Sequence, residues 1–139
     1  MECGWTPIES PKSLGKLPEF NNKVACYNLN EALPSGANAK EFLVYAFITS
    51  MGEGDEFQRG YYEISCKAND GKDLVQYMNV ATGPSVSVVN SVNLWFPIPN
   101  DAQLRIKLYH SKCDEQKKTS IAGTLAGQDW SDVFVVGYR

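Results

Sequence analysis

Apolar and polar residues alternate strictly along the stretch from Ser85 to Ile98. The even-numbered positions are mostly Val, Leu, Phe and Ile, whereas the odd-numbered positions include Ser, Asn and one tryptophan, Trp95. A period of two residues is typical of a β-strand with one dry face and one wet face. The stretch Gln103–Ser111 alternates in the same way. We therefore expect the two stretches to form a hairpin joined at residues 97–101, "PIPND".

Strand-like runs of this kind cover most of the chain and are separated by short clusters of Gly, Pro, Asn and Asp. The eight runs are Val24–Leu29, Glu41–Met51, Gly60–Ala68, Asp73–Ala81, Ser85–Ile98, Gln103–Ser111, Ser120–Ala126 and Asp132–Tyr138. Eight runs of this length and spacing predict an all-β fold, a two-sheet antiparallel β-sandwich of jelly-roll type. Residues 1–22 hold three prolines and two glycines and predict an irregular leader or edge segment. Residues 23–139 then form a single sandwich domain, with at most a short helical turn at Asn30–Leu33.

The run Glu41–Met51 is apolar on both faces, unlike most of the others. Its buried-type residues Val44 and Ala46 alternate with Tyr45 and Phe47 rather than with polar residues, and the last run, "DVFVVGYR", has a similar pattern. A two-layer sandwich has only one interior, so the second apolar face needs another cover. A neighbouring subunit or the N-terminal leader would supply that cover.

Trp95 lies on the polar face of its strand, beside Ser91 and Asn93. A large flat ring among small polar residues is typical of subunit interfaces and of sugar-binding platforms, because it buries much area at little cost in rotamer entropy. Three interpretations remain open at this point. Trp95 packs beneath the leader as a satellite of the core, lies in an oligomer interface, or stacks on a ligand.

Length and charge exclude several function classes. A chain of 139 residues is one domain by the usual length range, and its net charge of −3 comes from acidic and basic residues that are interspersed along the sequence. A nucleic-acid partner is not expected, since the only concentrated basic step is Lys117–Lys118. No apolar run is long enough to span a bilayer or to act as a secretion signal. The chain is then cytosolic, or its signal has already been removed.

The cysteines favour the second alternative, a secreted chain whose signal has been removed. The four cysteines, Cys3, Cys26, Cys66 and Cys113, are too far apart in sequence for a metal knuckle or a redox motif. An even number of cysteines suggests two disulfides and an oxidising compartment, although four reduced and mostly buried thiols are the alternative. The methionine directly before "ECGW" resembles an expression start on a mature N-terminus. We therefore expect a secreted, extracellular protein.

Candidate chemistry is sparse, and we expect no enzyme. The single histidine, His110, continues the core register of the strand before it, so it is interpreted as a structural histidine. Neither a cofactor nor a metal site is predicted. Two acidic loops, "GEGDEF" and "KANDGKD", offer oxygen ligands that suit calcium, but neither has the spacing of an EF-hand and Asn-Asp-Gly is first of all a tight turn.

Eight strands in about 115 residues, a strand apolar on both faces, aromatics on one sheet and the final strand "DVFVVGYR" together suggest a family. In these features the chain resembles the secreted jelly-roll heads of the complement globular-head and tumour-necrosis-factor group. That resemblance implies that the final strand lies near a threefold axis and helps to bury a subunit interface, so a homotrimer is the favoured assembly. It also implies partners that bind at the outer loops.

Two functions follow from these features. The preferred one is a non-enzymatic extracellular interaction module that forms a homo-oligomer and binds an unidentified protein or glycan. Its predicted interface residues are Tyr45, Phe47, Tyr61, Trp95, Phe134 and Tyr138. The alternative is a carbohydrate-binding, lectin-like jelly roll, which calcium would assist. Its predicted ligand-binding residues are Trp95, Trp130, Asn93, Asp70 and Asp132.

Overall fold

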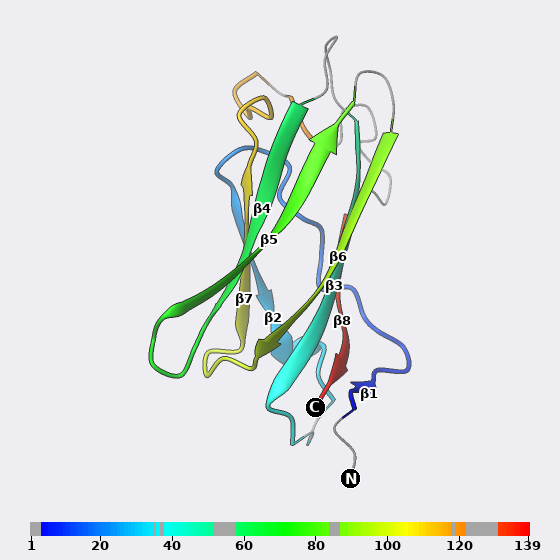
Figure 1. The fold of residues 1–139 in the computed structure, drawn as a ribbon, viewed down its shortest axis with the longest axis vertical. Coiled ribbons are helices and arrows are strands. Elements are labelled where there is room, and N and C mark those ends of the chain that lie inside the picture. The colour runs from blue at the N-terminus through cyan, green and yellow to red at the C-terminus, as the bar shows by residue number, and fades with distance from the viewer. Residues whose placement is uncertain are drawn as a thin grey trace.

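Two four-stranded antiparallel sheets stack face to face in the computed structural model (Figure 1). The structure describes residues 4–34, 36, 38–51, 58–83, 87–117, 119–121 and 131–139. Its strands are β1 (Thr6–Pro7), β2 (Val24–Asn28), β3 (Glu41–Met51), β4 (Gln58–Lys67), β5 (Asp73–Thr82), β6 (Ser87–Pro97), β7 (Gln103–Tyr109) and β8 (Ser131–Tyr138), with a short 3-10 turn, η1 (Leu29–Glu31). One sheet has the order β1-β8-β3-β6 and the other β2-β7-β4-β5.

The strand pairs identify the sandwich as a jelly roll. Strand β1 pairs with β8, β2 with β7, β3 with β6 and β4 with β5. Such nested pairs arise when one long hairpin, with β4 and β5 at its tip, is wrapped around a barrel. The fold class predicted from the alternation of the sequence is therefore confirmed.

The core lies between the sheets and is made of the inward-facing residues of every long strand. Phe42 of β3 and Phe96 of β6 are both buried, and their rings stack with centroids 5.7 Å apart. Tyr62, Ile64, Ile106 and the other inward residues of β4 and β7 close the opposite side of this layer. The period-two pattern thus places one face of each sheet in the core and leaves the other outside.

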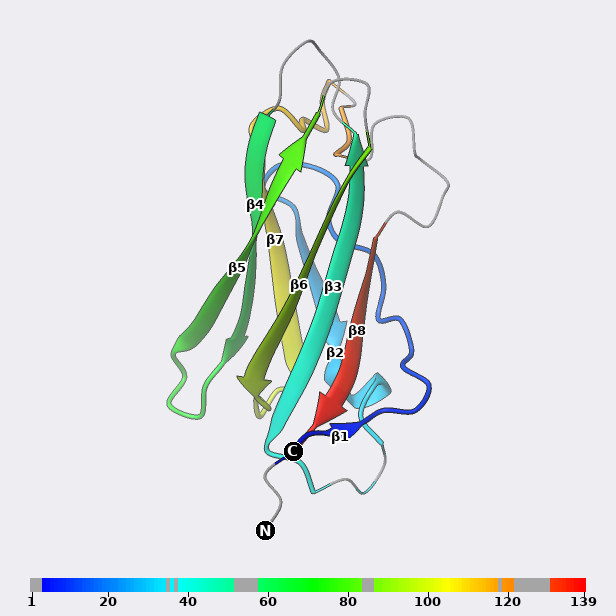
Figure 2. The same cartoon turned by 45° about the vertical axis from the view of Figure 1, so that its right-hand side comes forward.

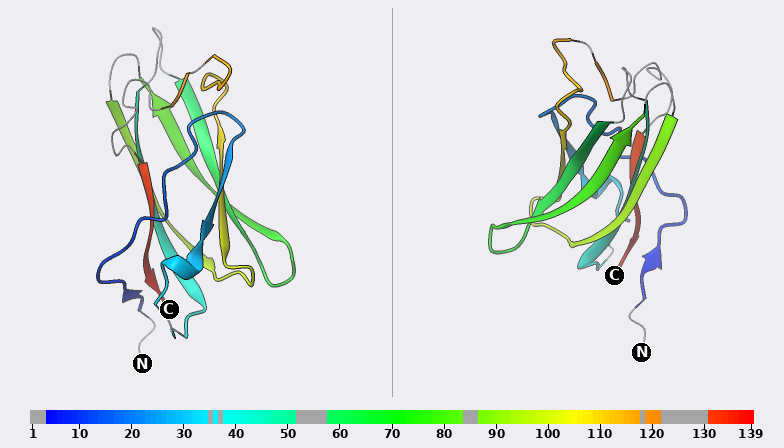
Figure 3. Two further views of the ribbon diagram at one scale, coloured as in Figure 1. Left: turned by 180° about the vertical axis from the view of Figure 1, so that it is seen from behind. Right: turned by 45° about the horizontal axis from the view of Figure 1, so that its top comes forward.

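The leader closes the open side of the sandwich between β8 and β2. The Ile8 and Leu14 N–H groups donate to carbonyls of β8, those of Val136 and Val133, and the Val133 N–H donates to Gly15. Figure 3 shows this segment, in blue, passing from the edge of β8 across to β2. It therefore extends one sheet at its edge and does not cover that sheet's outer face.

Side chains of the core hold the leader after it leaves β8. Leu17 and Pro18 are buried, and the Tyr62 hydroxyl donates to the Pro18 carbonyl at 2.7 Å. The Tyr27 hydroxyl likewise donates to the Lys16 carbonyl at 2.6 Å. Burial raises the pKa of both tyrosines above its ordinary value, so both hydroxyls stay protonated and able to donate.

Replacing Tyr62 by phenylalanine tests this anchor. The ring would stay in the core, but the Pro18 carbonyl would lose its partner inside a buried site, which costs about 1–2 kcal/mol of unfolding free energy. Urea unfolding measures this loss, and Tyr61→Phe is a matched control because the neighbouring tyrosine is exposed. Equal stability of the two variants would show that the hydroxyl does not anchor the leader.

Seven of the eight predicted strands agree with the structure to within about two residues at each end, and β3 matches at both ends. The sequence pattern did not predict the short strand β1, which lies inside the leader. Of the predicted strand Ser120–Ala126, residues 120 and 121 are not in a strand, and the rest lies outside the described residues. The expected helical turn near Asn30 is present as η1, which ends three residues before Pro34.

The predicted hairpin between β6 and β7 is wrong, because the two strands belong to different sheets. Pro97 and Pro99 lack the N–H groups that a hairpin ladder would need. The Ile98 N–H donates instead to the Lys40 carbonyl at 2.8 Å, which directs the chain across the end of the sandwich.

Candidate functional site

The outer face of the β1-β8-β3-β6 sheet is rich in aromatic residues. Figure 2 shows β6, β3 and β8 side by side in this sheet. Tyr45 lies between Phe134 of β8 and Asn93 of β6, and its ring stacks on Phe47 with centroids 5.9 Å apart. We call this surface the aromatic face and define it by Leu43, Tyr45, Phe47, Val89, Trp95 and Phe134.

The aromatic face is almost without charge. Across Leu43–Thr49 of β3 and the residues paired with them on β6 and β8, Asp132 is the one charged side chain among those described. Its carboxylate accepts a hydrogen bond from the Ser13 hydroxyl at 2.6 Å. The polar residues of the face are otherwise neutral, chiefly Ser91 and Asn93.

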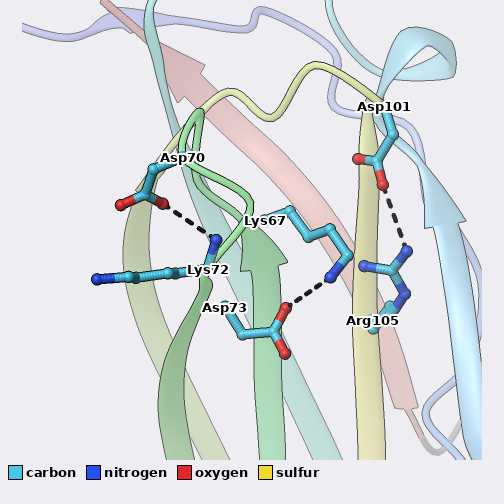
Figure 4. A network of polar contacts seen from close by, with 6 residues as sticks. All are labelled: Lys67, Asp70, Lys72, Asp73, Asp101 and Arg105. Atoms are coloured by element: carbon cyan, nitrogen blue, oxygen red, sulfur yellow. Dashed lines mark hydrogen bonds and ion pairs between the residues drawn. The ribbon is translucent and has the colours of Figure 1, made fainter.

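The outer face of the β2-β7-β4-β5 sheet has the opposite character. It carries charged side chains of both signs, namely Arg59, Glu63, Lys67, Asp73, Arg105 and Lys107. Two exposed ion pairs lie here: Lys67 pairs with Asp73 at 3.2 Å, and Arg105 pairs with Asp101 of the preceding turn at 3.3 Å (Figure 4). Solvated charges of this kind contribute little to stability but keep a surface in contact with water.

The structure divides the predicted interface residues between the two sheets. Tyr45, Phe47, Trp95 and Phe134 share the aromatic face. Tyr61 lies on the outer face of the other sheet and is therefore not part of the aromatic face. Tyr138 lies four residues beyond Phe134 on β8, past a shift of register between Leu43 and Val44, and pairs with the buried Phe42. The alternation of single strands does not reveal which sheet each strand joins.

Tyr61 belongs to a small cluster of tyrosines on its own sheet. Its ring stacks on Tyr109 with centroids 4.9 Å apart and meets the edge of Tyr77 at 5.6 Å. The Lys107 ammonium lies 4.7 Å from the centre of the Tyr109 ring. These contacts between neighbouring strands are cross-strand aromatic and cation–π pairs, which stabilise the sheet on its outer face.

Trp95 is 53% exposed, and the leader does not cover it. The leader follows β8, whereas Trp95 lies on β6 at the opposite edge of the sheet. The interpretation of Trp95 as a satellite of the core is therefore excluded. A subunit interface and a ligand platform remain as its two roles.

The residues predicted to bind a sugar do not all meet. Asn93, Trp95 and Asp132 lie on the aromatic face, but Asp70 lies in the β4–β5 turn, where its carboxylate accepts the Lys72 N–H at 3.0 Å (Figure 4). Trp130 lies outside the described residues. Gly71 adopts a φ of 83° in the same turn, which bears out the tight turn expected for Asn-Asp-Gly.

The prediction of two disulfides is wrong. Cys26, Cys66 and Cys113 are free thiols, and Cys3 lies outside the described residues. Cys26 is exposed on the edge strand β2, whereas Cys66 and Cys113 are buried. Burial raises the pKa of Cys66 to about 11 and that of Cys113 to about 12, so both thiols are protonated and unreactive near neutral pH.

His110 is a buried structural residue, as its position in the sequence predicted. It is 2% exposed, and its Nε2 lies 3.4 Å from the Thr82 hydroxyl. Its Nδ1 is buried and has no hydrogen-bond partner. Burial lowers the pKa of His110, because desolvation penalises the charged imidazolium.

Metal ligands and membrane-spanning elements are not found among the described residues. No group of three or more His, Cys, Asp or Glu side chains there is arranged to hold a metal ion. The loop "GEGDEF", residues 52–57, which was considered for calcium, lies outside the described residues. Nor does the described structure include a helix long and apolar enough to cross a lipid bilayer.

Comparisons with known proteins give no information on the function of this site. The chain matches no model of a known protein family, and the search of curated proteins finds no match either. A function for the aromatic face therefore has to be argued from its composition, exposure and position in the fold.

Proposed function

We propose that this protein is a non-enzymatic interaction module that assembles with copies of itself through the aromatic face. The observation that carries the proposal is the contrast between the two sheets: one outer face is charged, and the other combines aromatic residues with almost no charge. Interface centres are enriched in Tyr, Trp and Phe and depleted in charged residues.

The position of the face supports burial against a flat, similar surface. Its central strand, β3, is apolar on both sides, and Tyr45 and Phe47 are only partly shielded by their neighbours. Trp95 and Val89 at one edge are 53% and 66% exposed. An uncharged patch of this kind costs solvation free energy in a monomer and is typical of association surfaces.

We favour a trimer as the assembly. The resemblance to trimeric jelly-roll heads implies that the final strand lies in the subunit interface. Strand β8 belongs to the sheet with the aromatic face, and Phe134 lies next to Tyr45 on that face. The free thiols remove the argument for an oxidising compartment, so the proposal rests on the surface and makes no use of an extracellular location.

Sedimentation at micromolar concentrations tests the assembly. We expect a species with three times the chain mass of 15.4 kDa. Tyr45→Lys and Val89→Lys place a charge in the interface, where burial of an unpaired charge weakens association by about 30-fold or more. Val89 is exposed in the single chain, so its substitution leaves folding unchanged.

Tyr77→Lys is the matched control, since Tyr77 is 55% exposed on the charged sheet. The control should keep the mass of the assembly. A wild-type protein that sediments as a single chain would overturn the proposal. So would an assembly that Tyr77→Lys dissociates and that Tyr45→Lys and Val89→Lys leave intact.

A further inference from the structure

A groove lies at the end of the sandwich where the β4–β5 turn, the β6–β7 connection and the segment from η1 to β3 come together. Its volume is about 870 Å³, which falls within the range of small-molecule sites. Pro97 and Ile98 form part of its lining, and Asn30, Asn69 and Asn100 enter it from the three segments. Neither the interface proposed above nor the residues expected from the sequence include these asparagines.

The three asparagines give the groove its polar character. Their side-chain amides make no hydrogen bond to any other residue that the structure describes. An amide offers both a carbonyl acceptor and an NH₂ donor. A hydroxyl group also donates and accepts, so several amides converging on one groove suit a ligand with many hydroxyls.

Local hydrogen bonds order the three turns that carry the asparagines, and one of them is made by the Asn30 N–H itself. The Asn28 side chain accepts the Asn30 N–H at 3.0 Å, and Asp70 accepts the Lys72 N–H in the turn that follows Asn69. Asp101, next to Asn100, accepts the Gln103 N–H at 3.1 Å. Figure 4 shows Asp70 and Asp101 on these two neighbouring turns. A site held in shape before binding loses less entropy when the ligand arrives.

Ala102 in the groove wall adopts a φ of 54°, a left-handed conformation that is uncommon for alanine. Its carbonyl accepts the Leu29 N–H at 2.8 Å, which ties the β6–β7 connection to η1. Strain of this kind persists where the surrounding structure enforces it, and it is enriched at binding sites.

The backbone of the groove does not suit an extended peptide. Pro97 and Pro99 have no N–H group, and the Ile98 N–H already donates to Lys40. The N–H groups of Lys40 and Glu41 both donate to the Arg139 carbonyl at 2.9 Å. A peptide added as a strand needs free main-chain donors along its length, and this wall offers few.

Trp95 supplies an apolar platform beside the groove. It lies two residues before Pro97 on the same strand, so both side chains point to the same side of the sheet. Its exposed indole can stack on the C–H face of a sugar ring, while the amides in the groove bind hydroxyls. Of the two charged lining residues, Glu41 is paired with Arg139 at 2.9 Å, which leaves Lys40 as a single positive charge.

We propose that this groove binds a neutral oligosaccharide, with Asn30, Asn69 and Asn100 holding its hydroxyls and Trp95 stacking on one ring. We infer a neutral ligand because the polar side chains that line the groove are three uncharged amides and only one unpaired charge, that of Lys40. A single lysine lacks the paired donors that anionic ligands usually recruit. The site meets the aromatic face only at Trp95, which lies on the edge strand β6, six residues from Val89 and next to the groove. Its ring therefore lies at the rim of the proposed subunit interface, where a ligand in the groove still reaches it.

A glycan array of neutral and acidic oligosaccharides, followed by calorimetry with the best neutral ligand, tests the site. We expect the double variant N69A/N100A to weaken binding by about tenfold, since two ligand hydrogen bonds are lost. Trp95→Ala should weaken it by a similar factor. The matched controls N79A and Tyr77→Ala, which change an exposed asparagine and an exposed aromatic on the other sheet, should leave the affinity within about twofold.

Three outcomes would overturn this inference: no binding on the array, binding restricted to acidic glycans and lost in Lys40→Gln, or equal loss in the control variants. The sedimentation mass of N69A/N100A should match that of the wild type, because these asparagines lie outside the aromatic face. Val89→Lys should in turn keep the glycan affinity. The two proposals therefore fail independently.

Discussion

Replacing Gly60 by alanine should destabilise the fold by about 3 kcal/mol, close to the upper end for a single added methyl group. A Cβ at this position would lie 2.6 Å from the Tyr109 carbonyl oxygen and 2.7 and 2.8 Å from His110 Cδ2 and Cβ. The first of these atoms is backbone, so no rotation of a side chain relieves the clash. The His110 N–H is also tied to the Asn21 side chain at 2.8 Å, which resists any shift of the end of β7.

Urea unfolding of Gly60→Ala measures this effect, with Gly4→Ala as the control. A Cβ on Gly4 meets no atom within 4 Å, so this variant should unfold with a free energy within about 0.5 kcal/mol of the wild type. If Gly60→Ala were as stable as Gly4→Ala, β4 and the end of β7 could not be packed as closely as the structure places them.

Acidification should destabilise the protein through His110. Burial lowers the pKa of His110 in the folded protein, while in the unfolded chain it is near its ordinary value of about 6.5. Between those two values the unfolded chain binds the proton and the folded chain does not. Above pH ~6.5 the imidazole is neutral in both states, and the unfolding free energy does not depend on it. As the pH falls from there towards the lowered pKa of the folded protein, the unfolding free energy decreases by up to about 1.4 kcal/mol per pH unit.

The variant His110→Gln isolates this contribution. Its carboxylates titrate as in the wild type, so the difference between the two proteins reports on the imidazole alone. We expect the unfolding free energy of the wild type to fall more steeply from pH 7 to about pH 5 than that of the variant. Parallel curves would mean that the folded protein accommodates a charged His110, against its burial and its unpartnered Nδ1.

Gly60 and His110 illustrate how far sequence patterns reach. The even register of β7 correctly placed His110 in the core, because alternation along one strand is a local property. Gly60 gave no comparable signal. A side chain is excluded at this position by Tyr109 and His110, about fifty positions along the chain, and this depends on how β4 pairs with β7.

The candidate site shows the same division. That β3 is apolar on both faces was evident from "EFLVYAFITSM", and this correctly predicted that Tyr45 and Phe47 lie on the outer face of their sheet. The grouping of Tyr45, Trp95 and Phe134 on one face, and the separation of Tyr61 from them, depend on which strands share a sheet. The sequence did not show that Asn30, Asn69 and Asn100 meet in one groove, since each has the pattern of an ordinary turn residue.

The sequence by itself determined the all-β character, the inward and outward faces of each strand and the turns between them, because a period of two residues and the conformational preferences of Gly, Asn and Pro act over a few neighbouring residues. Only the tertiary structure decided the nested strand pairs, the leader's position along β8 and the convergence of three distant turns at one end. Those contacts join residues far apart in the chain, and packing of the whole core selects them.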